Sequence, residues 1–466
     1  MPSSDRLAGR QTTTKSRAEF WKHVVIALGI TVVCVQWVRL MASPRGDFDL
    51  HWELGRRLMA GEFLYTPVNG GDARGHDYPY LPFWALANAP FTLLPMHLAL
   101  VLFFPLFVFA LALLIGVLDR LTRGDTPLKK DALFWATAAA VALSVRFMLR
   151  DMMECGVNLA LVAMSWLSIY LWTRHREKLA GLVLGLAISL KCTPALFLAY
   201  FVWKRQWKMA MATTAAAAAF TISPILVMGP AEYGKSVTFW FSRAWDGVAG
   251  TDPSRGVLGE EPTQNISLRP SLARYLMRLP DDHKARLDHP LFFDVLDLSP
   301  QTAGLVSRII MLALMAAVAW RFRQPVKRRN DPTILWECAA VSILILLYSP
   351  ITWGQHCVGV FPAFYLIARN VAAGRPLSGW MKAVIGTYAV FILGLNRTVI
   401  GKSLSWLIDS YHIHTWCFVA LLAVAVACRR KYSAAANDQD ESLSPPDRPL
   451  QVECREDDEN SLRAAA

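Results

Sequence analysis

The chain has 466 residues, of which 54% are hydrophobic and only 18% are charged, and its mean hydropathy is +0.31. Soluble domains carry roughly 25% charged residues, so this composition excludes a soluble globular protein and is typical of a polytopic membrane protein. The formal charge of +12 comes from Lys and Arg in short clusters between apolar runs, which is a positive-inside pattern, so we exclude a nucleic-acid partner.

The N-terminal part of the chain predicts one membrane helix followed by an external loop. Residues 1–20 are polar and basic, and we interpret them as a short disordered cytoplasmic tail. The apolar run from Trp21 to Ser43 is too long for a signal peptide and no cleavage site follows it, so it is predicted to remain as the first membrane helix. Residues 44–95 then form the first external loop with a proline-broken apolar piece, which we interpret as interfacial or re-entrant because it is too short to span.

Long apolar runs recur to the end of the chain and predict an all-α polytopic bundle with about ten to twelve membrane-crossing helices. The expected full spans are residues 21–43, 96–118, 132–149, 155–173, 209–229, 303–320, 334–350, 355–369, 379–397 and 411–428.

The apolar stretch from Leu179 to Trp203 carries Lys191 at its centre, just before Pro194. As a single span it would hold a charge at the membrane midplane, at a cost of about 2.5–3.5 kcal/mol. A single crossing would also place the basic cluster at residues 321–329 outside, against the positive-inside rule. We therefore predict a short hairpin broken at Pro194, with both ends cytoplasmic and Lys191 in a polar cavity below the outer surface.

The domain organisation follows from these spans. A single transmembrane domain covers residues 21–429, and residues 230–302 form a large external loop with near-balanced charge, which we expect to be a small folded cap. Residues 430–466 are acidic and rich in Ser and Pro, and are predicted to be a disordered cytoplasmic tail. Both termini are thus expected in the cytoplasm, and the multi-pass protein in the cytoplasmic (inner) membrane.

With this topology, the polar residues that a plain helical bundle does not need gather on the external side. A carboxylate, a lysine and a histidine at one membrane face suit a reaction in which a base activates a hydroxyl while cations hold a phosphate. Each also has a structural interpretation, such as a snorkelling lysine, an interfacial histidine, a solvated loop carboxylate or an asparagine that bonds a neighbouring helix. The candidates are Asp47, Asp49, Tyr78, Asn158, Lys191, Asn265, Trp353 and His356.

The spacing of these residues resembles the landmarks of glycosyltransferase family 87, which comprises membrane glycosyltransferases of the GT-C type. The resemblance covers about residues 20–430. Its motifs are Asp47-Phe48-x-x-x-Trp52-x-x-Gly55-Arg56-x-Leu58-x-x-Gly61-x-x-x-Tyr65, Tyr78-Pro79, Leu190-Lys191-x-Thr193-Pro194-Ala195, Trp203-Lys204-Arg205-x-Trp207, Asn265-x-Ser267 and Ser349-Pro350-x-x-Trp353-x-x-His356. The chain departs from the family at Tyr80, where Pro is common, and at Cys155-Gly156-Val157-Asn158, where Gly-Gln-x-Asn is common.

The resemblance implies transfer of a hexose, mannose by analogy, from a polyprenyl-phosphate carrier to a lipid or glycan acceptor outside the cytoplasmic membrane. The family's first-loop Asp matches Asp47, which would act as the base, with Asp49 as the nearby alternative. We expect Lys191, helped by His356, to neutralise the leaving phosphate in one inverting displacement. Asn158, Asn265, Tyr78 and Trp353 are further candidates for substrate contacts. We expect no cofactor and no metal, since side chains alone can stabilise this leaving group and the eight scattered cysteines form no Cys-x-x-Cys pair.

Two other classes of protein fit part of the pattern. A secondary transporter also has broken helices with a charge at the break, but we find no repeated halves and no ionisable pair spaced through the membrane depth. A non-catalytic assembly subunit would leave the external Asp, Lys and His freely replaceable.

Overall fold

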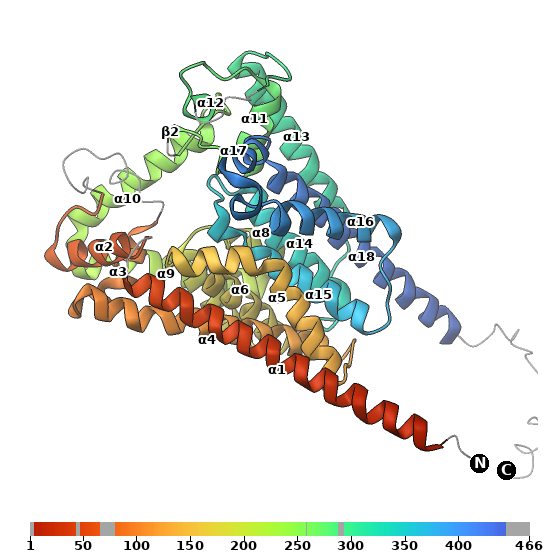
Figure 1. The fold of residues 1–466 in the computed structure, drawn as a ribbon. Helices are drawn as coiled ribbons and strands as arrows, with labels where there is room; N and C mark the ends of the chain where they lie inside the picture. Colours follow the sequence, from red (N-terminus) through yellow and green to blue (C-terminus); the bar gives the residue numbers. More distant parts are fainter. Residues whose placement is uncertain (1–3, 43–46, 66–79, 258, 288–292, 444–466) are drawn as a thin grey trace, which may run out of the picture.

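The computed structural model describes residues 4–42, 47–65, 80–257, 259–287 and 293–443 (Figure 1). Within these ranges the chain is helical except for turns and one antiparallel pair, β1 (Arg255–Gly256) and β2 (Gly259–Glu260), which confirms the predicted all-α class. The helices are α1 (Ser4–Ala42), α2 (Phe48–Ala60), α3 (Pro82–Asn88), η2 (Ala89–Leu93), α4 (Met96–Thr122), α5 (Lys130–Met153), α6 (Asn158–Thr173), α7 (Glu177–Leu190), α8 (Ala195–Trp203), α9 (Trp207–Ile222), α10 (Ile225–Ala249), α11 (Leu268–Leu276), α12 (Lys284–Leu287), α13 (Pro300–Arg321), α14 (Pro332–Tyr348), η3 (Gly354–Val360), α15 (Phe361–Ala372), α16 (Gly379–Tyr388), η4 (Ala389–Gly394), α17 (Arg397–Ser410) and α18 (Ile413–Leu443).

Charged side chains join the helices at one end of the bundle. Arg369 of α15 pairs with Asp119 of α4 at 2.7 Å, and Arg429 of α18 pairs with Glu337 of α14 at 3.1 Å. In Figure 1 the start of α1 and the end of α18 point to this side, whereas α2, α3, α10 and α11 lie away from it. The basic clusters therefore gather at one end, as the positive-inside pattern predicts.

The stretch from Leu179 to Trp203 forms the predicted hairpin, with α7 and α8 as its legs. At the base of α7, Glu177 lies 2.7 Å from Arg329, and at the base of α8 the Lys204 ammonium donates to the Phe322 carbonyl oxygen at 2.7 Å. Both contacts are with the same loop, between α13 and α14, so the two ends of the hairpin lie on one side. Lys191 lies at the tip, where helix α7 ends and before Pro194, the N-cap of α8.

Fewer helices than expected are long enough to span a membrane alone. Four qualify by length and composition among the described residues, namely residues 18–42 of α1, α4, α5 and α13. The apolar helices α6 and α14 have 16 and 17 residues. They reach only about 24–26 Å, against a hydrocarbon core of ~30 Å. The turns next to these short helices would therefore lie at membrane depth. Irregular backbone is tolerated at that depth where other parts of the protein bury it.

Two expected spans bend sharply into helices that the sequence did not predict. Helices α9 and α10 meet at 86°, and the pair α16 with η4 meets α17 at 103°. Within α10, Gly229 has a φ of 76° and precedes Pro230, so the chain leaves helical geometry there. A positive φ of this kind is readily adopted only by glycine. The span predicted at 209–229 is thus shorter, and residues 230–249 form a helix instead of part of a loop.

The predicted external cap, residues 230–302, contains most of α10, the β1–β2 pair, α11 and α12. The Arg269 side chain holds it together by donating to the carbonyl oxygens of Gly250 and Asp252 at 2.8 and 2.9 Å.

The two terminal tails are helical over part of their length, where we expected disorder. Helix α1 begins at Ser4, and α18 continues to Leu443, beyond residue 428 at which the last expected span ends. Residues 444–466 lie outside the described part of the chain.

Candidate active site

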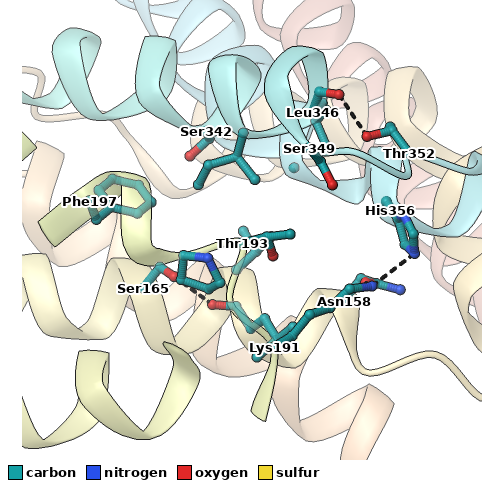
Figure 2. Close-up of a pocket in the computed structure, with 15 residues that line it drawn as sticks. Asn158, Ser165, Lys191, Thr193, Phe197, Ser342, Leu346, Ser349, Thr352 and His356 are labelled. Carbon is teal, nitrogen blue, oxygen red and sulfur yellow. Dashed lines mark hydrogen bonds between the residues drawn. The ribbon is translucent and has the colours of Figure 1, made fainter. Parts of the chain in front are cut away.

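Lys191 lies at the hairpin tip as a buried cation. Its side chain is buried, with 6% of the residue exposed, and its Nζ lies 3.1 Å from Asn158 Oδ1 and 2.9 Å from His356 Nε2 (Figure 2). An ammonium has three N–H donors, so these two contacts leave it able to make one more hydrogen bond. The structure therefore brings together three candidates that are distant in the sequence.

His356 is fixed by the turn between α14 and α15. Its Nδ1 lies 3.2 Å from the Ile351 carbonyl oxygen and 3.1 Å from the Trp353 backbone nitrogen. The Trp353 ring stacks on the imidazole with ring centroids 6.2 Å apart and an interplanar angle of 7°. A neutral imidazole carries one ring proton: with the proton on Nδ1, the ring donates to Ile351 and Nε2 accepts from Lys191, whereas with the proton on Nε2, Nδ1 accepts from the Trp353 backbone N–H. His356 therefore holds Lys191 from the side of this turn, and the Trp353 ring packs against the imidazole.

Asp47 stands immediately before helix α2, as its N-cap residue. Its backbone N–H donates to the Glu154 carbonyl oxygen at 3.0 Å, which ties α2 to the turn between α5 and α6. Partial burial is the main reason that the pKa of the Asp47 carboxyl rises from 3.8 to about 6; the carboxylates of Glu154 and Asp49 add to the rise, and the Lys191 ammonium opposes it. A carboxylate with a pKa close to neutrality is suited to general-base chemistry.

Asp49 lies in the first turn of α2 and differs from Asp47 in its surroundings. The residue is exposed, and its Oδ1 accepts a hydrogen bond from the Leu50 backbone N–H at 2.9 Å. Because the chain is helical from Phe48 onward, the two carboxylates leave the backbone in different directions.

Tyr80, at which the chain departs from the family pattern, lies beneath the lysine. The Lys191 ammonium is 5.6 Å from the centroid of the Tyr80 ring, and that ring stacks on Trp84 with 4.8 Å between centroids. His51, one turn after Asp47 on α2, is buried and accepts a hydrogen bond at Nδ1 from the Trp84 indole at 3.0 Å. Burial, aided by the Lys191 charge, lowers the pKa of His51 to about 3, so this side chain is neutral.

Asn265 lies apart from this group, and its side chain has structural partners. Its Nδ2 donates to Glu261 at 2.7 Å and to the Pro350 carbonyl oxygen at 2.9 Å, and its Oδ1 accepts from the Thr352 backbone N–H at 2.9 Å. These bonds tie the segment at residues 230–302 to the turn that carries His356. Asn265 is completely buried, which leaves it no free group for a substrate or a glycan.

A pocket opens beside Lys191 between α6, α8, α14 and η3, and Figure 2 shows several hydroxyl groups around it. Apolar atoms contribute most of the surface of its wall. The lining residues are Asn158, Leu161, Val162, Ser165, Lys191, Thr193, Pro194, Phe197, Ser342, Ile345, Leu346, Ser349, Thr352, His356 and Gly359. Tyr78, the remaining candidate, lies outside the described residues.

The sequence analysis missed Asp151, a carboxylate at the end of α5. It is completely buried and accepts a hydrogen bond from Asn158 Nδ2 at 2.7 Å. Its position in the sequence could have indicated a role, because Asp151, like Asp47, follows closely after the end of a predicted span. Across the described residues, no group of three or more His, Cys, Asp or Glu side chains could hold a metal ion.

Comparison with known families decides between the classes of protein that the sequence left open. The profile of glycosyltransferase family 87 matches residues 78–350, which is more than half of the chain. The chain belongs to glycosyltransferase family 87. This family 87 enzyme is therefore a multi-pass membrane glycosyltransferase, as the motif resemblance indicated, and neither a transporter nor a non-catalytic subunit.

Two relatives of the family 87 enzyme carry the same description, polyprenol-phosphate-mannose-dependent alpha-(1-2)-phosphatidylinositol mannoside mannosyltransferase. The one from Mycolicibacterium smegmatis (strain ATCC 700084 / mc(2)155) is 26% identical over 469 residues, which cover 91% of this chain and 94% of the relative. The one from Mycobacterium tuberculosis (strain ATCC 25618 / H37Rv) is 27% identical over 395 residues, covering 78% and 82%. Among solved structures, apo ArnT from Cupriavidus metallidurans matches with a TM-score of 0.38 and 15% identity, over 93% of this chain and 82% of that chain.

Proposed function

We propose that the enzyme transfers mannose from a polyprenyl-phosphate carrier to a phosphatidylinositol mannoside or a similar lipid-linked glycan. The observation that carries the proposal is the buried Lys191 ammonium, which is held by Asn158 and His356 and has one donor to spare. A buried cation with a free N–H, beside a mostly apolar pocket, suits the phosphate of a lipid carrier. The descriptions of the two relatives supply the sugar and the acceptor class.

The proposed reaction is a single displacement. The Asp47 carboxylate takes the proton from an acceptor hydroxyl, and the hydroxyl oxygen attacks the anomeric carbon of the sugar. The bond from that carbon to the phosphate oxygen breaks, and its electron pair stays on the departing polyprenyl phosphate. The Lys191 ammonium compensates the charge that develops there. One displacement inverts the anomeric configuration.

We place the catalytic domain at residues 21–429 and the site on the outer side of the cytoplasmic membrane, with both termini inside. The support is the separation of charge, since the ion pairs of Glu177 and Arg369 are at the end of the bundle opposite Lys191 and Asp47. The basic end is expected to face the cytoplasm.

This orientation predicts a labelling pattern. In a cysteine-free background, single cysteines at Lys178 and Lys208 should both resist an impermeant thiol reagent in intact cells, and a cysteine at Asp297 should react. All three side chains are exposed, so burial would not hide them. Labelling of both Lys178 and Lys208 without permeabilisation would reverse the orientation, and labelling of one alone would contradict the hairpin.

The substrate assignment is tested with purified enzyme, radiolabelled polyprenyl-phosphate mannose and phosphatidylinositol mannosides. We expect a labelled mannolipid with one additional hexose, and no product when a nucleotide-linked mannose replaces the carrier lipid. Parallel reactions with polyprenyl-phosphate glucose test the choice of sugar. Transfer from the nucleotide sugar alone, or from the glucose carrier alone, would overturn the proposal.

A further inference from the structure

The carboxylate of Asp151 is buried in the turn that joins α5 to α6, and both of its oxygens are in use. Oδ1 accepts from Asn158 Nδ2 at 2.7 Å, and Oδ2 accepts from the Leu159 backbone N–H at 2.9 Å. Because Val157, the N-cap of α6, makes no capping bond with its side chain, Asp151 supplies the cap from the preceding helix.

The turn is shaped around this carboxylate. The Gly156 backbone N–H donates to the Asp151 carbonyl oxygen at 2.7 Å. A Cβ atom added at Gly156 would lie 1.9 Å from Asp151 Oδ1, so only glycine leaves room for the carboxylate. Cys155 completes the turn with a φ of 50°, a conformation that is uncommon for residues other than glycine.

Each end of the turn holds one part of the proposed site. At one end, the Glu154 carbonyl oxygen accepts from the Asp47 backbone N–H at 3.0 Å. At the other end, Asn158 uses its Nδ2 for Asp151 and thereby turns its Oδ1 toward Lys191, 3.1 Å from Nζ. An amide whose nitrogen is bonded to a carboxylate must present its oxygen on the other side.

We propose that Asp151 is a positioning residue for glycosyl transfer, which fixes Asn158 so that its oxygen aims the Lys191 ammonium at the leaving phosphate. The inference rests on the proposed function. Asp47 takes the acceptor proton in the proposed reaction, whereas Asp151 bonds only to Asn158 and to the backbone of α6. Asp151 thus acts on Lys191 through Asn158.

The test uses the full-length enzyme with Asp151→Asn. An asparagine there can still cap Leu159 through its oxygen, but its Nδ2 then faces Asn158 Nδ2, and two donors cannot bond. Asn158 must reverse its amide and present an N–H group to Lys191. We expect kcat to fall about ten- to a hundred-fold while the KM for the carrier lipid changes less than about threefold, because the lysine contact strengthens as the phosphate leaves.

Exchanging the two residues should reverse the loss. In the double variant Asp151→Asn with Asn158→Asp, the amide caps Leu159 and donates to the new carboxylate, which accepts from Lys191 with its other oxygen. We expect kcat to return to within about threefold of the wild type. Asn158→Asp alone should be impaired, since it places two carboxylates in contact. Asp297→Asn, at an exposed carboxylate of the external cap, is the matched control and should leave kcat unchanged.

Affinity for polyprenyl phosphate without sugar is the second measurement. Free polyprenyl phosphate is the leaving group after the bond has broken, so this affinity, unlike the KM for the sugar-bearing carrier, should weaken about tenfold in Asp151→Asn. It should recover in the exchanged pair, whichever sugar the enzyme transfers. Wild-type enzyme that binds the carrier but transfers no mannose would contradict the proposed function alone. The positioning role is overturned if Asp151→Asn keeps wild-type kcat and affinity, or if the exchanged pair folds with a wild-type melting temperature and recovers neither.

Discussion

Replacing Asp47 with asparagine should lower glycosyl transfer by about 10²- to 10⁴-fold, the range typical for loss of a general base. Asparagine keeps the size of the side chain and can keep the backbone bond from residue 47 to Glu154, but it cannot accept a proton. Expression and binding of the carrier lipid should therefore stay close to those of the wild type. The variant separates the chemical step from folding.

Asp49→Asn is the matched control. It should lower glycosyl transfer tenfold or less, which is about the effect of losing a nearby charge. Sequence could not rank the two carboxylates, because residues two apart share a face in an extended loop. The structure ranks them by environment, since Asp47 is partly buried close enough to Lys191 to feel its charge, and Asp49 is exposed and bonded to its own helix. Loss of activity in Asp49→Asn with full activity in Asp47→Asn would make Asp49 the base.

The pH profile provides an independent check on Asp47. Its pKa is raised to about 6, and only the ionised form can accept a proton. In the wild type, kcat/KM should fall about tenfold per unit below pH ~6, and should also decline above pH ~8, because burial lowers the pKa of the Lys191 ammonium to about 8. An ordinary aspartate would keep its activity to pH ~4. A profile that is flat down to pH 4 would show that Asp47 is not the base.

Much of the fold follows from the distribution of charge along the chain. The rule that basic clusters share one side predicted the hairpin around Lys191, and contacts of Glu177 and Lys204 with one loop confirm it. The same rule brought Lys191, Asn158 and His356 to one end of the bundle. Topology can be predicted in this way because insertion into the membrane depends on two properties of whole segments, their hydrophobicity and the charge of their flanking residues.

The remaining features depend on contacts between distant segments, which hydropathy does not record. In the sequence, Asp151 is one charge in a short turn that we expected outside the membrane. In the structure α6 folds back against it and buries it completely. Asn265 reads as a site residue, but its partners at Pro350 and Thr352 are about 85 positions away in the sequence, which makes it structural. Helix α17 was missed because it turns away from the preceding apolar run at 103°.

Lys191→Met should lower kcat about ten- to a hundred-fold, because a charge-assisted hydrogen bond to the departing phosphate contributes roughly 1.5–3 kcal/mol. Methionine fills a similar volume without a charge, so Asn158 and His356 lose a donor and the apolar packing is kept. Lys204 is unsuitable as the control, because its ammonium is buried 2.8 Å from Glu337 and its loss would destabilise the bundle. Lys208→Met, at an exposed side chain, is the better comparison and should keep wild-type kcat.

The same variant should also move the acid limb that we assign to Asp47. The Lys191 ammonium opposes the rise in the pKa of that carboxyl, so removing it should move the pKa above the wild-type value of about 6. The fall in kcat/KM should then begin at higher pH in Lys191→Met than in the wild type, while Lys208→Met shows no displacement. A lower kcat with an unmoved acid limb would mean that Lys191 acts on the phosphate without sensing the base. Full activity with an unmoved limb would mean that the lysine only extends from the hairpin tip, and the phosphate site would have to be sought elsewhere.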